Sequence, residues 1–114
     1  MVQEQKISVI IPVFNEVEVI DACYERLTAV MSGIDGFAYE LVFVDDGSKD
    51  DTCERLLEFH ARDPHLKIIK FSRNFGHQIA VTAGVDEVDG DAIVIIDADL
   101  QDPPEVIPDM IRKW

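Results

Sequence analysis

Residues 41–52 read LVFVDDGSKDDT, and the fold depends on this pattern. The run Leu41–Val44 is apolar throughout instead of alternating, which is typical of a strand covered on both faces. Turn-forming residues follow at once, and Gly47 can adopt the positive φ of a tight turn. Three residues here can cap a following helix: Ser48, Asp50 and Asp51. The stretch therefore predicts a buried strand, a turn and a helix.

The same unit recurs along the chain. The other apolar runs are Ile7–Val13, Ile68–Phe71 and Ala92–Ile96. The stretches with helical spacing are Ile20–Met31, Cys53–His60, Ala80–Val88, whose small residues favour close packing on the sheet, and Val106–Ile111. Alternating strands and helices predict an α/β fold, a Rossmann-like parallel sheet with right-handed crossovers. We expect the strand order 3-2-1-4.

Composition restricts the partners. The chain has 114 residues, with 23 acidic and 10 basic side chains and a formal net charge of −13. Such a chain repels phosphate backbones, so we expect no nucleic-acid partner. Cys23 and Cys53 lie in separate helical patterns, which favours reduced thiols and a cytoplasmic chain. The sequence leaves the oligomeric state open.

Residues 1–114 are expected to form one unit without a linker. Four strands make a small sheet for this architecture, and the sequence closes on a predicted helix at Trp114. We therefore expect the chain to be a truncated part of a longer protein.

The common phosphate-binding loops are missing. The first strand-to-helix turn reads PVFNEVEV and holds no glycine, and neither G-x-G-x-x-G nor G-x-x-x-x-G-K-[ST] occurs in the chain. The nucleophile elbow G-x-S-x-G is also missing. The chemistry must therefore be carried by other loops.

Polar residues gather where the predicted strands end. They are Asn15 and Glu16, Asp45–Ser48, Ser72–Asn74, and Asp97–Asp102. Open α/β sheets bind ligands at the carboxyl ends of their strands, where the strand order reverses. We therefore expect one crevice at this edge, with Asn15 and Asp97 facing each other across it.

Asp97, Asp99 and Gln101 form the predicted metal site. Two carboxylates at a strand end can point at one hard cation and leave positions for water and a diphosphate, while Gln101 can add a neutral oxygen. The alternative is that they only cap the turn before Pro103. Asp86–Asp91, in the same acidic stretch, is expected to be a solvated face.

The remaining candidates each have a structural alternative. Asp45 or Asp46 can accept hydrogen bonds from a ligand base or ribose, or serve the turn alone. Asn15 and Glu16 can face the ligand or cap the first helix. Arg73 can contact a ligand diphosphate or base, or it can form a surface ion pair. His77 can cap the helix or act as a catalytic group.

Four motifs together resemble glycosyltransferase family 2, with its GT-A fold. They are VIIPVFNE, LVFVDDGSKDDT, IIKFSRNFGHQIAVTAG and GDAIVIIDADLQDPPE, in the family's order. SRNFGHQ with DADLQDPPE is similar to the branch that moves a hexose from a UDP-sugar to a polyprenyl phosphate at the cytosolic membrane face. The resemblance implies the nucleotide-binding half of that fold, and SRNFGHQ favours UDP-glucose or a related donor over GDP-mannose.

The resemblance also implies roles for the matching positions. Pro12, Asn15 and Glu16 would line the nucleoside pocket, and Asp46 would meet the base with support from Asp45. Arg73 would approach the base or diphosphate. Asp97, Asp99 and Gln101 would hold Mg²⁺ or Mn²⁺ against the diphosphate, with Asp97 also contacting the donor. Catalytic residues, the acceptor side and membrane segments would lie beyond Trp114.

Two alternatives are kept beside this interpretation: a metal-dependent nucleotide-binding half-domain that is inactive by itself, and a family 2 enzyme with another donor such as GDP-mannose. A haloacid-dehalogenase-type phosphatase is disfavoured, because its D-x-D motif follows the first strand, whereas Asp97 and Asp99 follow the fourth.

Overall fold

The computed structural model describes residues 5–99, 101 and 103–113. Its strands are β1 (Gln5–Val13), β2 (Phe37–Asp45), β3 (Leu66–Lys70) and β4 (Ala92–Ile95). Its helices are α1 (Ile20–Ser32), α2 (Thr52–Arg62), α3 (His77–Glu87) and α4 (Ile107–Lys113), the last preceded by the 3₁₀ turn η1 (Pro104–Val106). The strands form one parallel sheet in the order β3-β2-β1-β4, so the predicted fold class and strand order are confirmed.

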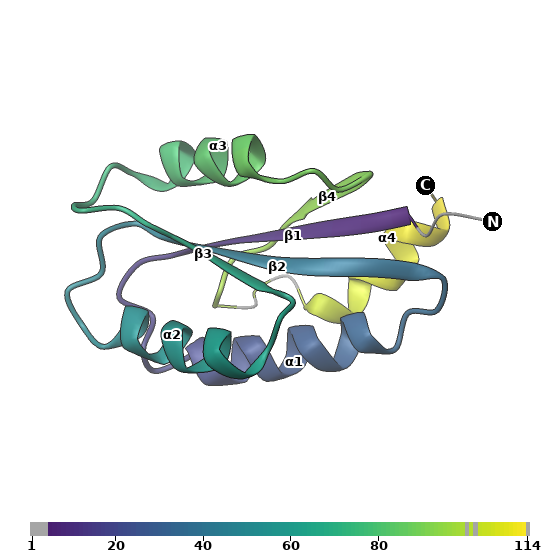
Figure 1. Ribbon diagram of the computed structural model, residues 1–114, viewed down its shortest axis with the longest axis horizontal. Helices are drawn as coiled ribbons and strands as arrows, with labels where there is room; N and C mark the ends of the chain where they lie inside the picture. The colour runs from purple at the N-terminus through teal and green to yellow at the C-terminus, as the bar shows by residue number, and fades with distance from the viewer. Residues whose placement is uncertain (1–4, 100, 102, 114) are drawn as a thin grey trace.

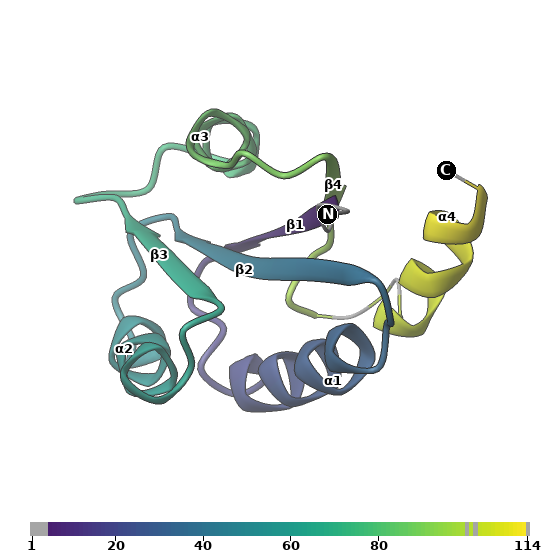
Figure 2. The same ribbon diagram turned by 45° about the vertical axis from the view of Figure 1, so that its right-hand side comes forward.

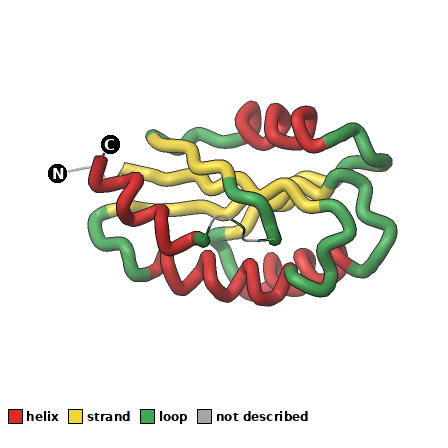
Figure 3. Tube along the Cα trace, turned by 180° about the vertical axis from the view of Figure 1, so that it is seen from behind, coloured by secondary structure: helices red, strands yellow, loops and turns green. Residues whose placement is uncertain are grey.

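The sheet lies between two helical layers (Figure 1, Figure 3). Helices α1 and α2 cover one face, and α3 covers the other (Figure 2). Ile7, Val9 and Ile11 point into the core beneath α1, whereas Ile10 belongs to the core beneath α3. All four side chains are fully buried. Strand β1 therefore holds the two layers together, and its carboxyl end lies between those of β2 and β4.

Helix α3 approaches the sheet closely, as its small residues predict. Ala80 and Gly84 are its buried residues among those described. A Cβ atom at Gly84 would lie only 2.6 Å from Cγ2 of Ile10. The first turn of α3 is thus fixed near the carboxyl end of β1.

Strand β4 corrects one prediction. Its apolar run suggested burial on both faces, but Ile93 and Ile95 are 43% and 48% exposed, while Val94 and Ile96 are buried. Ile95 is paired in register with Ile10, on the α3 side, and α3 packs on β1 and β2 instead of β4. An apolar run at an edge strand therefore does not guarantee two covered faces.

Helix α4 is also less buried than its pattern suggested. Ile107 is fully buried against the core beneath α1, and Ile111 packs against that core. Val106 and Met110, which the pattern placed on the same apolar face, are exposed by 38% and 49%. In the part of the chain that the structure describes, every helix is too short or too polar to span a bilayer.

Both cysteines are free and buried, as expected for reduced thiols. Burial, with the nearby Glu16 carboxylate, raises the pKa of Cys23 to about 12. Its sulfur therefore stays protonated at neutral pH and packs as an apolar group.

A buried carboxylate lies in the amino-terminal half of β2, away from the carboxyl ends of the strands that form the predicted crevice. Glu40 is 4% exposed; it accepts a hydrogen bond from the Ser8 hydroxyl at 2.6 Å and pairs with Lys67 at 3.0 Å. Burial alone would raise the pKa of Glu40, but the bonds from Ser8 and Lys67 and the charge of Lys6 outweigh it, and the pKa is lowered.

We expect this lowered pKa to make the fold acid-sensitive. Glu40 stabilises the folded state fully above its unfolded pKa, near the ordinary value of 4.5, and the contribution is lost as the pH falls through the lower folded value. Urea unfolding between pH 7 and pH 3 should show this loss of stability. Glu40→Gln should flatten the dependence of the unfolding free energy on pH. A mutant curve parallel to that of the parent chain would contradict the assignment.

Candidate functional site

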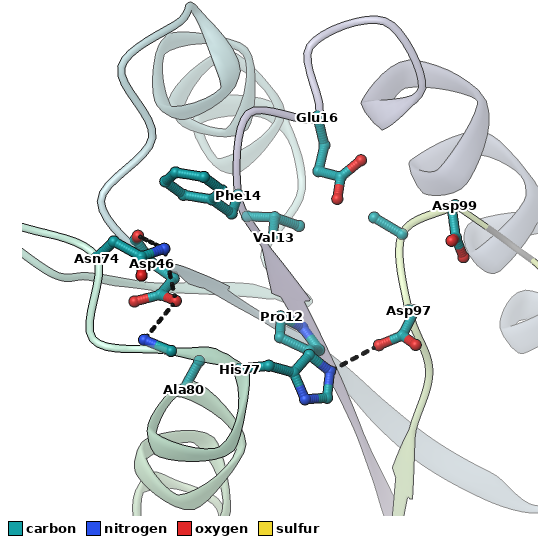
Figure 4. A pocket seen from close by; sticks show the side chains of 12 residues that line it. Pro12, Val13, Phe14, Glu16, Asp46, Asn74, His77, Ala80, Asp97 and Asp99 are labelled. Atoms are coloured by element: carbon teal, nitrogen blue, oxygen red, sulfur yellow. Dashed lines mark hydrogen bonds and ion pairs between the residues drawn. The ribbon is translucent and has the colours of Figure 1, made fainter.

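A pocket of about 290 Å³ lies at the carboxyl ends of β1, β2 and β4, beside the first turn of α3 (Figure 4). It is lined by Pro12, Val13, Phe14, Glu16, Asp46, Asn74, Gly76, His77, Ala80, Asp97, Ala98 and Asp99. This is the edge at which the sequence predicts a crevice. Glu16, rather than Asn15, faces Asp97 across it, which corrects that detail.

Asp46 connects the β2 edge to the start of α3. Its side chain is buried, and its Oδ1 accepts a hydrogen bond from the Phe75 amide at 2.7 Å. Its Oδ2 accepts from the Gly76 amide at 3.0 Å and from Asn74 Nδ2 at 3.1 Å. The carboxylate therefore holds the loop at residues 74–76 while it also lines the pocket.

Asn15 and Glu16 tie the loop after β1 to the loop after β2. Asn15 has a φ of 51°, its amide donates to Ser48 Oγ at 2.8 Å, and its Oδ1 accepts from the Lys49 amide at 2.8 Å. The Glu16 amide donates to Thr52 Oγ1 at 2.9 Å, which leaves the Glu16 carboxylate on the pocket side. Asn15 thus supports the pocket without lining it.

The turn after β2 forms as predicted. Gly47 has a φ of 79°, and the fully buried Asp45 accepts a hydrogen bond from the Ser48 amide at 2.9 Å. The N-cap residue of α2 is Asp51, which makes no side-chain cap hydrogen bond, while Oδ1 of Asp50 accepts a hydrogen bond from the Thr52 amide at 2.9 Å. Asp45 is therefore a support for the turn and lies behind the pocket.

Asp97 and Asp99 project from the loop after β4. His77 Nε2 lies 2.9 Å from Asp97 Oδ1, across the mouth of the pocket. Asp99 Oδ1 accepts from the backbone amide of Gln101 at 3.2 Å, and the Gln101 residue is exposed. Asp102, a further carboxylate of the predicted cluster, lies outside the described residues.

The pocket is electronegative. Burial raises the pKa of Glu16, and the charges of Asp99, Asp50 and Asp97 raise it further. Among the described lining residues there is no lysine or arginine. A ligand diphosphate would therefore meet carboxylates first.

The donor atoms suit Mg²⁺ or Mn²⁺, the ions expected from the sequence. Carboxylate oxygens are the ligands that these hard cations prefer, and one or two carboxylates with substrate phosphates are a common ligand set. Within residues 5–99, 101 and 103–113, no three Asp, Glu, His or Cys side chains lie close enough to enclose an ion by themselves. Asp97 and Asp99 thus fit a metal that shares its coordination with a phosphate ligand.

Arg73 lies beside the pocket instead of in it. Its guanidinium carbon lies 4.4 Å from the centre of the Phe75 ring, a cation–π distance. It lines an adjacent hollow of about 440 Å³ together with Lys49 and Lys70. Phe14 and Asn74 line both the pocket and the hollow. The adjacent hollow therefore brings positive side chains to the β3 side of the pocket.

Two contributors to the site were missed or undervalued in the sequence. Asn74 stood in the predicted polar loop, but no local signal indicated its contact with Asp46 across 28 residues. The sequence favours His77 as a helix cap over a catalytic group, but α3 has no side-chain cap hydrogen bond and its N-cap residue is Gly76. The sequence signal for His77 is its place at the start of the predicted helix, and its position opposite Asp97 comes from the structure.

A parallel α/β sheet with a pocket at the carboxyl ends of its strands defines the class of protein: a Rossmann-like fold of the kind that binds ligands at this edge. The family model for glycosyl transferase family 2 matches residues 8–114, and the chain belongs to this family. The predicted membership is confirmed, and the sheet is part of a GT-A fold.

Relatives extend the comparison. The chain is 59% identical over 107 residues to the uncharacterized glycosyltransferase YkcC of Bacillus subtilis. The aligned region covers 94% of this chain and 33% of YkcC. It is 45% identical over 109 residues to the prophage bactoprenol glucosyl transferase homolog of Escherichia coli K12. That alignment covers 96% of this chain and 35% of the homolog. The chain thus spans about a third of the length of the curated relatives it matches.

A solved structure supports the fold. Glucosyl-3-phosphoglycerate synthase from Mycobacterium tuberculosis, in complex with Mn²⁺, UDP and glucosyl-3-phosphoglycerate, has a TM-score of 0.70 and 27% identity. The match covers 91% of this chain and 37% of the synthase.

Proposed function

We propose that this chain forms the donor-binding part of a glycosyltransferase that moves a hexose, namely glucose, from UDP to a polyprenyl phosphate at the cytosolic face of the membrane. The bactoprenol glucosyl transferase relative supports the sugar and the acceptor. The UDP and Mn²⁺ of the solved synthase support the donor and the ion.

The observation that carries this proposal is the charge of the pocket. Glu16, Asp46, Asp97 and Asp99 line it, and every described lysine and arginine lies elsewhere. A nucleoside diphosphate brings more negative charge to these carboxylates, so its binding requires a divalent cation between them. Binding of donor and metal should therefore be strongly cooperative.

The residues divide into two groups in this proposal. Pro12, Asn15, Glu16, Asp45 and Asp46 form or support the nucleoside side, with Arg73 approaching the base or diphosphate from the neighbouring hollow. Asp97, Asp99 and Gln101 hold Mg²⁺ or Mn²⁺ against the diphosphate. When bound, the ion acts as a Lewis acid that offsets the charge of the leaving UDP.

The chain's own residues bind and orient the donor, and we assign none of them to the attack on the sugar. In the proposed reaction the lipid phosphate oxygen forms the new bond to C1 as the bond from C1 to the UDP oxygen breaks. Orientation of this phosphate would supply much of the rate, and we assign that role to none of the described residues.

Thermal melts with UDP alone, Mn²⁺ alone and both together test the proposal. Saturation of a two-state fold at 100 times Kd stabilises it by about 2.7 kcal/mol. We expect a shift of that size only when UDP and Mn²⁺ are both present, because the carboxylates repel UDP alone.

GDP with Mn²⁺ is the control for the nucleotide. A larger shift with GDP than with UDP would replace the proposed donor with a guanosine sugar. A full shift from UDP in EDTA would contradict the metal-bridged site.

A further inference from the structure

We propose that His77 is a positioning residue that holds the Asp97 carboxylate in place for the metal and diphosphate, an inference that rests on the proposed function. The imidazole comes from the first residue of α3 and the carboxylate from the loop after β4, and Nε2 and Oδ1 lie 2.9 Å apart. The two side chains meet beside Pro12, between opposite walls of the pocket (Figure 4).

The position of His77 is fixed by the residues before it. The buried Asp46 carboxylate accepts hydrogen bonds from the Phe75 and Gly76 amides at 2.7 and 3.0 Å. Gly76 has a φ of 108°, and α3 is held against the sheet at Ala80. The backbone of His77 thus starts from a rigid support on the β2 side.

Asp97 has less support of its own. The ladder between β1 and β4 continues to the amide of Ile96, which donates to the Ile10 carbonyl at 3.0 Å. For the Asp97 carboxylate, the His77 ring is the one hydrogen-bond partner found among the described residues. His77 therefore sets where this carboxylate points, provided that Nε2 carries the proton.

The contact has little value for stability. The two side chains are 64% and 59% exposed, and exposed pairs of this kind contribute about 0–1 kcal/mol. Its value lies in orientation, because Oδ1 is occupied by the imidazole and Oδ2 stays available to a cation. Hydrogen-bond partners of metal-binding side chains commonly change metal affinity by about 10–100-fold when removed.

The arrangement also joins the two halves of the site. Asp46, on the proposed nucleoside side, holds residues 74–76, and His77 follows directly and holds Asp97, on the proposed metal side. One hydrogen-bonded path therefore crosses the pocket from β2 to β4.

Mn²⁺ binding in the presence of excess UDP tests this role. The sharp electron paramagnetic resonance signal of free Mn²⁺ reports binding without any sugar transfer. For His77→Ala we expect Mn²⁺ affinity to fall by about tenfold or more, with an unchanged melting midpoint in the absence of ligand. His77→Gln keeps a neutral N–H donor at a similar reach and should restore most of the affinity.

Gln78→Ala is the matched control, since Gln78 is the next exposed residue of α3 and should leave Mn²⁺ binding unchanged. Equal affinity in His77→Ala and the parent chain would overturn the positioning role and leave the proposed function intact. Equal losses in His77→Ala and His77→Gln would also overturn it. If the parent chain binds no Mn²⁺ with UDP, the proposed function fails, and this inference fails with it.

Discussion

Gly47→Ala should destabilise the chain by about 2–5 kcal/mol, because it combines a left-handed backbone with a steric clash. Gly47 has a φ of 79°, which an alanine adopts only at a cost. A Cβ atom there would lie 2.3 Å from the carbonyl carbon of Arg73 and 2.5 Å from the Asn74 nitrogen. These are backbone atoms, so the loops after β2 and β3 would have to separate. Urea unfolding at neutral pH measures the loss.

Gly36→Ala separates the two causes. Gly36 has a similar φ of 85°, but a Cβ there would have no neighbour within 4 Å. Gly36→Ala should therefore reduce the stability only by the cost of the left-handed backbone conformation, about 1–2 kcal/mol. Equal losses in the two variants would show that the close approach of the loops is not what requires glycine at position 47.

The packing at Gly47 also affects the site. Separating the loops would move Asn74 and the residues after it, which Asp46 holds through hydrogen bonds. We therefore expect Gly47→Ala to weaken the joint binding of UDP and Mn²⁺ even at temperatures where the chain stays folded.

The fold could be predicted because its signals are local. Apolar runs such as Ile7–Val13 identify strands, and helical spacing between them leaves a parallel sheet as the simple solution. The exposure of Ile93 and Ile95 could not be predicted in this way. Their burial depends on how far α3 extends across the sheet, and the composition of β4 does not contain that information.

The site was predicted only in part, for a similar reason. The acids at strand ends could be located, because the carboxyl ends of parallel strands share one edge. The hydrogen-bond partner of each acid could not be predicted. Asp46 bonds to residues 28–30 positions away along the chain, and Asp97 bonds to a residue 20 positions away. Arg73 likewise turns to the ring of Phe75, two residues along the chain, instead of into the pocket.

Asp99→Asn should weaken Mn²⁺ binding by more than about 100-fold in the presence of UDP, because it removes a proposed ligand and not merely the hydrogen-bond partner of one. Asp99 and Asp97 are the carboxylates that the β4 loop brings to the pocket, and asparagine supplies a neutral oxygen in place of an anionic one. Calorimetric titration of Mn²⁺ into the chain with saturating UDP gives the affinity directly.

Asp89→Asn is the control, because it removes the same charge from the same acidic stretch. Asp89 lies before β4, 79% exposed, and pairs with Lys6 at 2.8 Å. Losing that surface pair costs about 0–1 kcal/mol of stability and removes no proposed ligand. If both variants lost Mn²⁺ affinity equally, the net charge of −13 would explain the attraction, and no ion would be held by Asp99. A large loss in Asp99→Asn alone is expected, since only there does the fold fix the carboxylate beside Asp97.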